Sequence, residues 1–312
     1  MKAVTIRDGR LLFEEHPDPA PGSGEVLVRV WAAGINGADM HQRAGRYPAP
    51  PGSPQDIPGL ELAGEVVERG PGAERFRDGD RVMGIVGGGG QAELAVVNER
   101  ILMTIPDEIG WPPAGGFPET FTTAHDALFT QAGLHPGEHL LVHGGAGGVG
   151  TAAIQLGVTA GARVTATVRN PELRGAVGAL GAEVIAPEGF AEHGPFDVIL
   201  ELVGAINLAD NIAALNTKGR IAVIGTGAGA TGELNLGLLM SKRGRIHGSM
   251  LRARPLEEKA LTARAIERSV LPLLASGALK VLVAETYPLS QAKIAYDRFA
   301  AGGKLGKIVL TG

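Results

Sequence analysis

The stretch HLLVHGGAGGVGTAAIQLG, residues 139–157, decides the fold class of this chain. It opens with a short, continuously apolar run at 139–143, typical of a strand buried on both faces of a parallel sheet. Glycines follow at GxxGxxG spacing (Gly144, Gly147, Gly150), and a helix pattern comes next. Such glycines permit a tight turn, let the backbone approach a pyrophosphate and let helix and strand pack closely. Because an anion binds the free N–H groups at a helix start, the stretch predicts a dinucleotide site and not merely a structural turn.

Strand and helix patterns alternate on both sides of this stretch. Further strands are predicted at 163–168, 183–185, 197–200, 220–224 and 245–249, and helices at 122–131, 149–159 and 171–180. This alternation predicts an α/β fold with a doubly wound parallel sheet, a Rossmann domain, over residues 115–253.

Residues 1–114 have a different pattern, in which short strands are separated by turn residues. Strands are predicted at 1–8, 26–31, 65–68, 81–83 and 94–97, and prolines and glycines gather in a loop at 44–59. The tail has one long helix pattern at 256–275 and β character at 278–283 and 307–310. We therefore expect residues 1–114 and 254–312 to form one discontinuous, β-rich domain around the Rossmann domain.

The length and composition exclude several classes of protein. A chain of 312 residues suggests two domains at about 150 residues each. The formal net charge is −4 with acids and bases mixed along the chain, which argues against binding to nucleic acid or to an anionic membrane surface. No apolar run approaches ~18 residues, and the N-terminus lacks the apolar run of a signal peptide. Cysteine is absent, which excludes disulfides, thiol catalysis and cysteine-ligated zinc, so we expect a soluble, cytoplasmic enzyme.

The end of the second Rossmann strand indicates which dinucleotide binds. A site for NAD usually has an acidic residue there, which binds the ribose 2′-hydroxyl. This strand ends at Val168-Arg169-Asn170-Pro171, and no acid occurs before Glu172. The guanidinium of Arg169 could bind a 2′-phosphate, although Arg169 could also be a solvated residue at a strand end. The sequence favours NADPH.

Two segments of the β-rich domain resemble metal-binding segments of zinc alcohol dehydrogenases. Residues 34–39 and 58–64 resemble the segments that carry the catalytic cysteine and the Gly-His-Glu motif, with Asn36 in place of the cysteine and Leu60 in place of the histidine. Zinc catalysis is therefore not expected.

Further segments extend the resemblance over nearly the whole chain; they lie at 43–48, 118–121, 140–145, 151–156, 248–254 and 306–310. The chain resembles the zinc-independent medium-chain dehydrogenases/reductases of the NADPH:quinone oxidoreductase (ζ-crystallin-like) group. Within that group it is most similar to the p53-inducible quinone oxidoreductase branch.

This resemblance implies a GroES-like substrate domain, a Rossmann domain, and a cleft that holds NADPH and a flat acceptor. It implies hydride transfer to a quinone or another α,β-unsaturated carbonyl without zinc, and a homodimer formed through Rossmann edge strands, with 245–250 as the candidate edge. The residues that it assigns to the cofactor are Ala146, Gly147, Gly148 and Val149 at the pyrophosphate, Arg169 at the 2′-phosphate, and Thr123, Gly225, Thr226, Met250 and Leu251 around the nicotinamide. Asn36 and Tyr47 would face the substrate or the nicotinamide, and Tyr47 matches the proton donor of related 2-enoyl-thioester reductases.

Alternatives remain for both the residues and the function. Tyr47 could be a packing aromatic at the base of its loop, and Asn36 could satisfy backbone groups in its own turn. The eight histidines show no ligand spacing, and His143 is interpreted as structural. Gln91 replaces an aromatic that is common in relatives, and the short segment 186–195 predicts the loss of a helix. Two other functions are a 2-enoyl-thioester reductase and a non-catalytic NADPH-binding protein.

Overall fold

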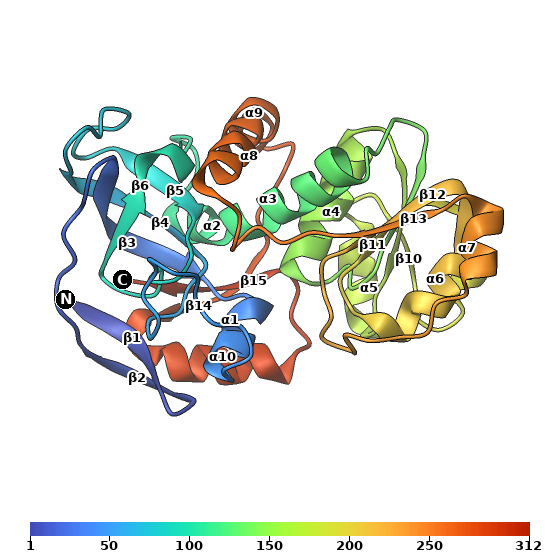
Figure 1. Ribbon diagram of the computed structural model, residues 1–312, viewed down its shortest axis with the longest axis horizontal. Coiled ribbons are helices and arrows are strands. Elements are labelled where there is room, and N and C mark those ends of the chain that lie inside the picture. Colours follow the sequence, from blue (N-terminus) through green and yellow to red (C-terminus); the bar gives the residue numbers. More distant parts are fainter. The chain divides into compact units, whose positions relative to one another are not determined.

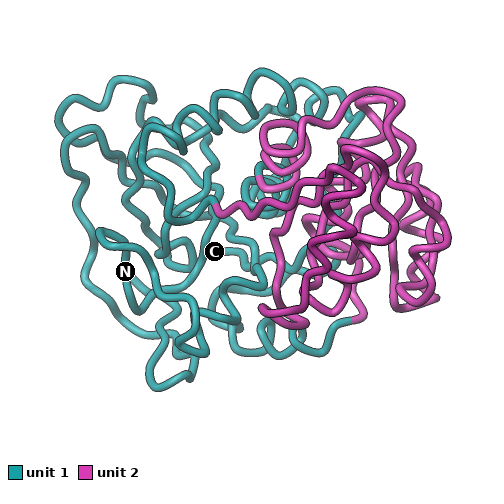
Figure 2. Tube along the Cα trace, turned by 45° about the vertical axis from the view of Figure 1, so that its right-hand side comes forward, with its two compact units in different colours: residues 1–122, 251–302, 307–312 teal, residues 123–250, 303–306 magenta.

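A computed structural model describes all residues, 1–312, and the chain folds into two units (Figures 1 and 2). Unit 1 comprises residues 1–122, 251–302 and 307–312, and unit 2 comprises residues 123–250 and 303–306. The chain passes from one unit to the other mainly at 122/123 and 250/251. The domain boundaries expected from the sequence are 114/115 and 253/254. No helix in the chain is both long and apolar enough to span a membrane.

Unit 2 is built on one six-stranded parallel sheet. Its strands are β8 (His139–Val142), β9 (Arg163–Thr167), β10 (Glu183–Ile185), β11 (Phe196–Glu201), β12 (Leu215–Val223) and β13 (Arg245–Gly248). They are arranged in the order β10-β9-β8-β11-β12-β13. From β8 the chain adds β9 and β10 toward one edge of the sheet, and it then returns to add β11, β12 and β13 toward the other edge. This order confirms the predicted doubly wound sheet, whose ligands bind where the direction reverses.

Apolar strands explain why this sheet is buried on both faces. The middles of β8 and β11 consist of Leu140 to Val142 and Val198 to Leu200, and every one of these side chains is fully buried. The connecting helices are α4 (Gly148–Thr159), α5 (Pro171–Gly178), α6 (Leu208–Ala214) and α7 (Leu236–Lys242). Segment 186–195 contains only a 3-10 turn at Phe190–His193, in agreement with the predicted loss of a helix.

Unit 1 contains a hairpin and a seven-stranded sheet. The hairpin pairs β1 (Lys2–Arg7) with β2 (Arg10–Glu15). The sheet has the order β14-β15-β3-β4-β5-β7, with β6 also paired to β3. These strands are β3 (Glu25–Gly34), β4 (Glu61–Arg69), β5 (Arg81–Ile85), β6 (Leu94–Asn98), β7 (Leu102–Thr104), β14 (Val283–Pro288) and β15 (Lys307–Thr311). Because β15 pairs with β3, the end of the chain joins the sheet formed by its beginning.

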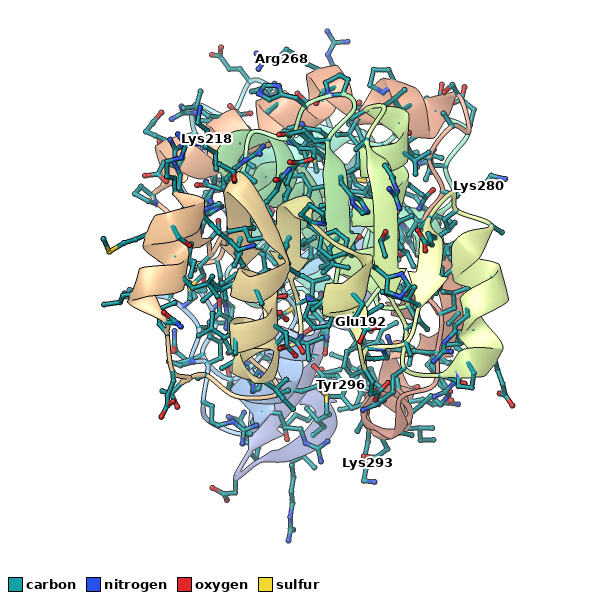
Figure 3. All side chains as sticks on the ribbon, turned by 90° about the vertical axis from the view of Figure 1, so that its right-hand side faces the viewer. Glu192, Lys218, Arg268, Lys280, Lys293 and Tyr296 are labelled. Carbon is teal, nitrogen blue, oxygen red and sulfur yellow. The ribbon has the colours of Figure 1, made fainter.

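Unit 1 also contains five helices: α1 (Gly37–Arg43), α2 (Trp111–Gly116), α8 (Leu256–Ser269), α9 (Leu271–Ala275) and α10 (Ala292–Ala301). A sixth helix, α3 (Pro118–His125), begins in unit 1 and continues into unit 2. Helix α10 packs on β2, β14 and β15 (Figure 1). Along α10, Tyr296 is fully buried, whereas the Lys293 side chain is 68% exposed (Figure 3).

The tail corrects two predictions. The single helix expected at 256–275 is two helices, because Pro272 lacks an N–H and would clash with the carbonyl one turn earlier. The β character expected at 278–283 is found only at Val283, where the strand begins; residues 278–282 form a bend and an irregular segment. The apolar pattern there reflects Leu279, which is buried and whose N–H donates to the carbonyl of Leu273.

The helix expected at 122–131 also differs from the structure. It begins earlier, as α3 at Pro118, and residues 126–131 continue it as a π-helix. A proline suits the first helical position because its missing N–H has no partner there, and this accounts for the earlier start.

Candidate functional site

The glycine turn after β8 has a geometry that only glycine can supply. Gly144 has a φ of +68°. A Cβ on Gly150 would lie 2.4 Å from the carbonyl oxygen of Gly144, and one on Gly145 would lie 2.9 Å from the Cβ of Ala166. Gly147 is the N-cap of α4, so the first N–H groups of that helix have no partner within it. An anion can therefore come close to the backbone of this turn and to the positive N-terminal end of α4.

The other predicted cofactor residues of unit 2 gather at the same edge of the sheet. Arg169 follows β9, Gly225 and Thr226 follow β12, and Met250 follows β13, just as the glycine turn follows β8. Because the strands are parallel, their carboxyl ends meet at one edge. A Cβ on Gly225 would lie 2.2 Å from the carbonyl oxygen of Leu202, so this position also requires close backbone approach.

Thr123 carries an unsatisfied polar atom. Its side chain is buried, and its Oγ1 atom makes no hydrogen bond within the chain. A buried hydroxyl without a partner is costly, and a ligand that supplies the partner would remove the cost. Together with the glycine turn, this orphaned hydroxyl fits a nicotinamide dinucleotide.

Arg169 is exposed and has no hydrogen bond or ion pair. The neighbouring groups are already engaged: Asn170 accepts from the N–H of Glu172 at 3.0 Å, and Arg174 donates to the carbonyl of Val168 at 3.0 Å. The guanidinium of Arg169 is therefore the free cation at the end of β9.

His143 is held by neighbours within unit 2. It is buried, and its two ring nitrogens lie 3.2 Å from Thr167 Oγ1 and 2.8 Å from Asn211 Oδ1. Burial is the main cause that lowers its pKa, which the nearby Glu201 carboxylate partly offsets. This geometry agrees with a structural role.

Unit 1 contains a buried ion pair between two strands of its sheet. Glu61 on β4 is fully buried and Lys307 on β15 is 3% exposed. The Lys307 ammonium donates to Glu61 Oε1 at 2.6 Å, to Asn36 Oδ1 at 2.6 Å and to the carbonyl of Ile35 at 2.9 Å. All three of its donors are satisfied, as a buried charge requires.

Asn36 belongs to this network. Its Nδ2 donates to Glu61 Oε1 at 2.9 Å, while its Oδ1 accepts from Lys307. A further contact, of 3.4 Å, joins Nδ2 to the carbonyl of Gly34. Both ends of the amide are therefore engaged inside the protein, chiefly with the side chains of Glu61 and Lys307 and not with backbone groups of its own turn.

Two further carboxyl groups extend the network. Asp39 accepts from the N–H of Asn36 at 2.8 Å and from that of Gly59 at 3.1 Å. The N–H of Glu119 donates to Glu61 Oε2 at 2.9 Å, but Glu119's own Oε2 is buried and unpaired. Burial raises the pKa of Asp39 to about 7. Burial, followed by the charge of Glu61, raises the pKa of Glu119 to about 8.

Tyr47 is partly buried beneath Arg252. The Arg252 guanidinium lies 4.8 Å from the centre of the Tyr47 ring and donates to the Tyr47 carbonyl at 2.9 Å. It also donates to the carbonyl of Gly87 at 2.8 Å and to Gln42 Oε1 at 2.6 Å, which fixes the cation in place. Burial raises the pKa of the Tyr47 hydroxyl, and the charge of Glu119 raises it further.

The remaining predicted positions lie inside unit 1. Leu251 is 9% exposed and lines a cavity together with Thr122, whose buried Oγ1 has no partner. Gln91 is fully buried, and its Oε1 accepts from the Tyr296 hydroxyl at 2.9 Å. The Gln91 side chain therefore fills the interior of unit 1.

The residues at the metal-binding positions do not fit zinc. The two positions that the resemblance matches to zinc ligands hold Asn36 and Leu60, and the Lys307 ammonium lies against the Glu61 carboxylate. No group of three or more histidine, aspartate or glutamate side chains in the chain could hold a metal ion.

Sequence reasoning did not find Glu61, Glu119, Lys307 or Arg252 as site residues. A signal was present, because Glu61 and Lys307 each interrupt an apolar strand pattern. Such a charge at a buried position requires a partner of opposite sign. The partner of Glu61 lies 246 positions away in the chain, so only the fold could identify it.

Comparisons with known proteins show the family of the chain. Residues 22–107 match the alcohol dehydrogenase GroES-like domain, and residues 180–310 match the family described as zinc-binding dehydrogenase. A quinone oxidoreductase of Rattus norvegicus is 30% identical over 304 residues, which cover 94% of this chain and 90% of the relative.

Two solved structures resemble the whole chain. A quinone oxidoreductase of Pseudomonas syringae has a TM-score of 0.88 and 28% identity, and the match covers 100% of this chain and 99% of the other. A mycobacterial protein in complex with NADPH has a TM-score of 0.88 and 27% identity, with 100% of both chains covered.

Proposed function

Because the chain belongs to the medium-chain dehydrogenase/reductase family, we propose that it is an NADPH-dependent reductase of quinones or other α,β-unsaturated carbonyl compounds. The family membership makes it an oxidoreductase that binds a nicotinamide cofactor. The observation that carries the proposal is the set of cofactor positions that follow the carboxyl ends of β8, β9, β12 and β13.

The choice of NADPH over NADH depends on Arg169. A 2′-phosphate adds negative charge at the end of β9, where this exposed guanidinium has no other partner. The 2′-hydroxyl of NADH carries no charge to pair with the Arg169 guanidinium.

The bound cofactor would supply a hydride, and the protein's residues would orient the reactants. In unit 2, the glycine turn and the start of α4 hold the pyrophosphate through Ala146 to Val149, and the Thr123 hydroxyl is available to the nicotinamide. In unit 1, Tyr47 faces the acceptor, and Arg252 holds its ring. Asn36 keeps the nearby Lys307–Glu61 pair in place, and we propose that no zinc takes part.

The experiment is NADPH oxidation against 9,10-phenanthrenequinone, 1,4-benzoquinone, a simple enone and crotonyl-CoA, with NADH as a parallel donor. Turnover of quinone or enone with a preference for NADPH supports the proposal. Turnover of crotonyl-CoA alone would instead indicate a 2-enoyl-thioester reductase. Tight NADPH binding without turnover of any acceptor would indicate a non-catalytic binding protein.

We also propose a homodimer formed through β13. This strand is the edge of the unit 2 sheet, so its outer N–H and C=O groups are free to pair with a second copy. The preceding helix α7 exposes Leu236 and Met240 by 63% and 75%. Size-exclusion chromatography with light scattering should give twice the chain mass of 32.1 kDa, and a strict monomer would contradict the proposal.

A further inference from the structure

The proposed reaction requires a proton as well as a hydride. When a hydride adds to the β-carbon of an enone, a C–H bond forms, the C=C π bond breaks and the electron pair moves to the carbonyl oxygen. NADPH is oxidised to NADP⁺ and the acceptor becomes an enolate, or a hydroquinone monoanion when the acceptor is a quinone. One proton, on oxygen or on the α-carbon, completes the product. We infer that Glu119 donates this proton, an inference that rests on the proposed function.

The charges of unit 1 leave one proton in the buried cluster. Asp39, Glu61 and Glu119 are three acids, and the two cations near them are Lys307 and Arg252. With every group ionised, the cluster would carry one excess negative charge away from water. A buried, uncompensated charge is costly, so the cluster is most stable when one acid keeps its proton.

Hydrogen bonds decide which acid keeps it. Glu61 accepts from Lys307, from Asn36 and from a backbone N–H, and Asp39 accepts from two backbone N–H groups. Hydrogen bonds of this kind favour the ionised form. The carboxyl group of Glu119 accepts none, and its Oε2 is buried without a partner. The proton therefore resides on Glu119, consistent with its pKa of about 8 against about 7 for Asp39.

Glu119 can also deliver a proton and recover it. Although Oε2 is buried, the residue as a whole is partly exposed. In the inferred cycle, Glu119 is reprotonated from solvent after each turnover. Burial is the largest cause that raises the pKa of the Tyr47 hydroxyl, and Glu119 raises it further only when it is ionised. Tyr47 is thereby a weaker acid than ordinary tyrosine, and at neutral pH a carboxylic acid with the pKa of Glu119 gives up its proton far more readily.

The test replaces Glu119→Gln in the full-length protein, which keeps the shape and removes the proton. Loss of a general acid should lower kcat for the enone by about 100-fold or more. The affinity for NADPH, followed by the cofactor's fluorescence, should stay unchanged. Wild-type kcat should fall as the pH rises through about 8, and the variant should lose this dependence. The matched control is Glu108→Gln, an exposed glutamate of the same unit, which should behave as wild type.

Tyr47→Phe provides the second variant, in case Glu119→Gln does not fold. If Glu119 is the acid, Tyr47→Phe keeps the decline in kcat near pH 8 even where its activity is lower. Loss of that decline in Tyr47→Phe, or wild-type kcat in Glu119→Gln, would overturn the inference while the reductase assignment stands. A wild-type protein that reduces no acceptor would overturn both.

Discussion

The two sheets of this protein use their interiors differently. In unit 2, the middles of β8 and β11 bury only apolar side chains, and the proposed cofactor residues lie in the loops that follow the strands. In unit 1, charged side chains enter the sheet itself, with Glu61 at the start of β4 and Lys307 at the start of β15. Unit 2 also buries a charged residue, Glu201 at the end of β11, but neutral donors satisfy it, namely the Val203 N–H and the Asn211 amide, whereas unit 1 pairs two charges between strands.

The largest effect that we expect comes from Lys307→Met. It leaves the Glu61 carboxylate buried and uncompensated, which should lower the free energy of unfolding by about 3–5 kcal/mol. Both tryptophans of the chain, Trp31 and Trp111, lie in unit 1, so urea unfolding followed by their fluorescence reports on that unit. The double variant Lys307→Met/Glu61→Gln removes both charges and should recover part of the loss. If Lys307→Met is as stable as wild type, the charged interior does not support unit 1.

An intermediate effect is expected from Arg169→Ala in unit 2. Loss of a charge-assisted contact to the 2′-phosphate should weaken NADPH binding by roughly 10- to 100-fold and leave NADH binding unchanged. Because Arg169 is exposed and forms no hydrogen bond or ion pair, stability should change by less than about 0.5 kcal/mol. The affinities for NADPH and NADH are measured by titration. The control is Arg163→Ala, a substitution at the start of the same strand. Equal weakening of NADH binding would argue against the assigned role.

The smallest effect should appear in the pH dependence of stability. Asp39 and Glu119 have raised pKa values in the folded protein, against ordinary values of 3.8 and 4.5. The folded state therefore binds more protons than the unfolded state between about pH 4 and pH 8, and stability should fall as the pH rises through this window. Glu119→Gln should flatten the decline in unit 1, as measured by tryptophan fluorescence in urea at pH 5, 6, 7 and 8. An unchanged slope would show that Glu119 is not the buried acid.

The same contrast explains what the sequence could predict. The Rossmann sheet, the glycine turn and Arg169 follow from contiguous segments, because a strand, a turn and a helix encode that binding edge locally. The charged cluster joins residues 36, 39, 61, 119 and 307, which are far apart in the sequence. The pairing of β15 with β3 and of β3 with β4 brings Lys307 to Glu61, and α1 and α3 add Asp39 and Glu119. The break between α8 and α9 could be predicted from the sequence, because the ring of Pro272 does not fit inside a helix. The bend around Leu279 could not, because it depends on the burial of that side chain in the folded protein.

The position of Lys307 on the last strand has a consequence for how the protein is made. Glu61 leaves the ribosome 246 residues before the lysine that neutralises it, which at about 5–20 residues per second is a delay of roughly 12–50 s. All six strands of unit 2 are complete at Gly248, so that sheet can form during synthesis. In unit 1, β6 can pair with residues 25–29 of β3 early, but residues 32–34 of β3 lack their partner until β15 is synthesised. During that interval unit 2 lacks only residues 303–306, whereas unit 1 has a strand edge without its partner, which favours aggregation.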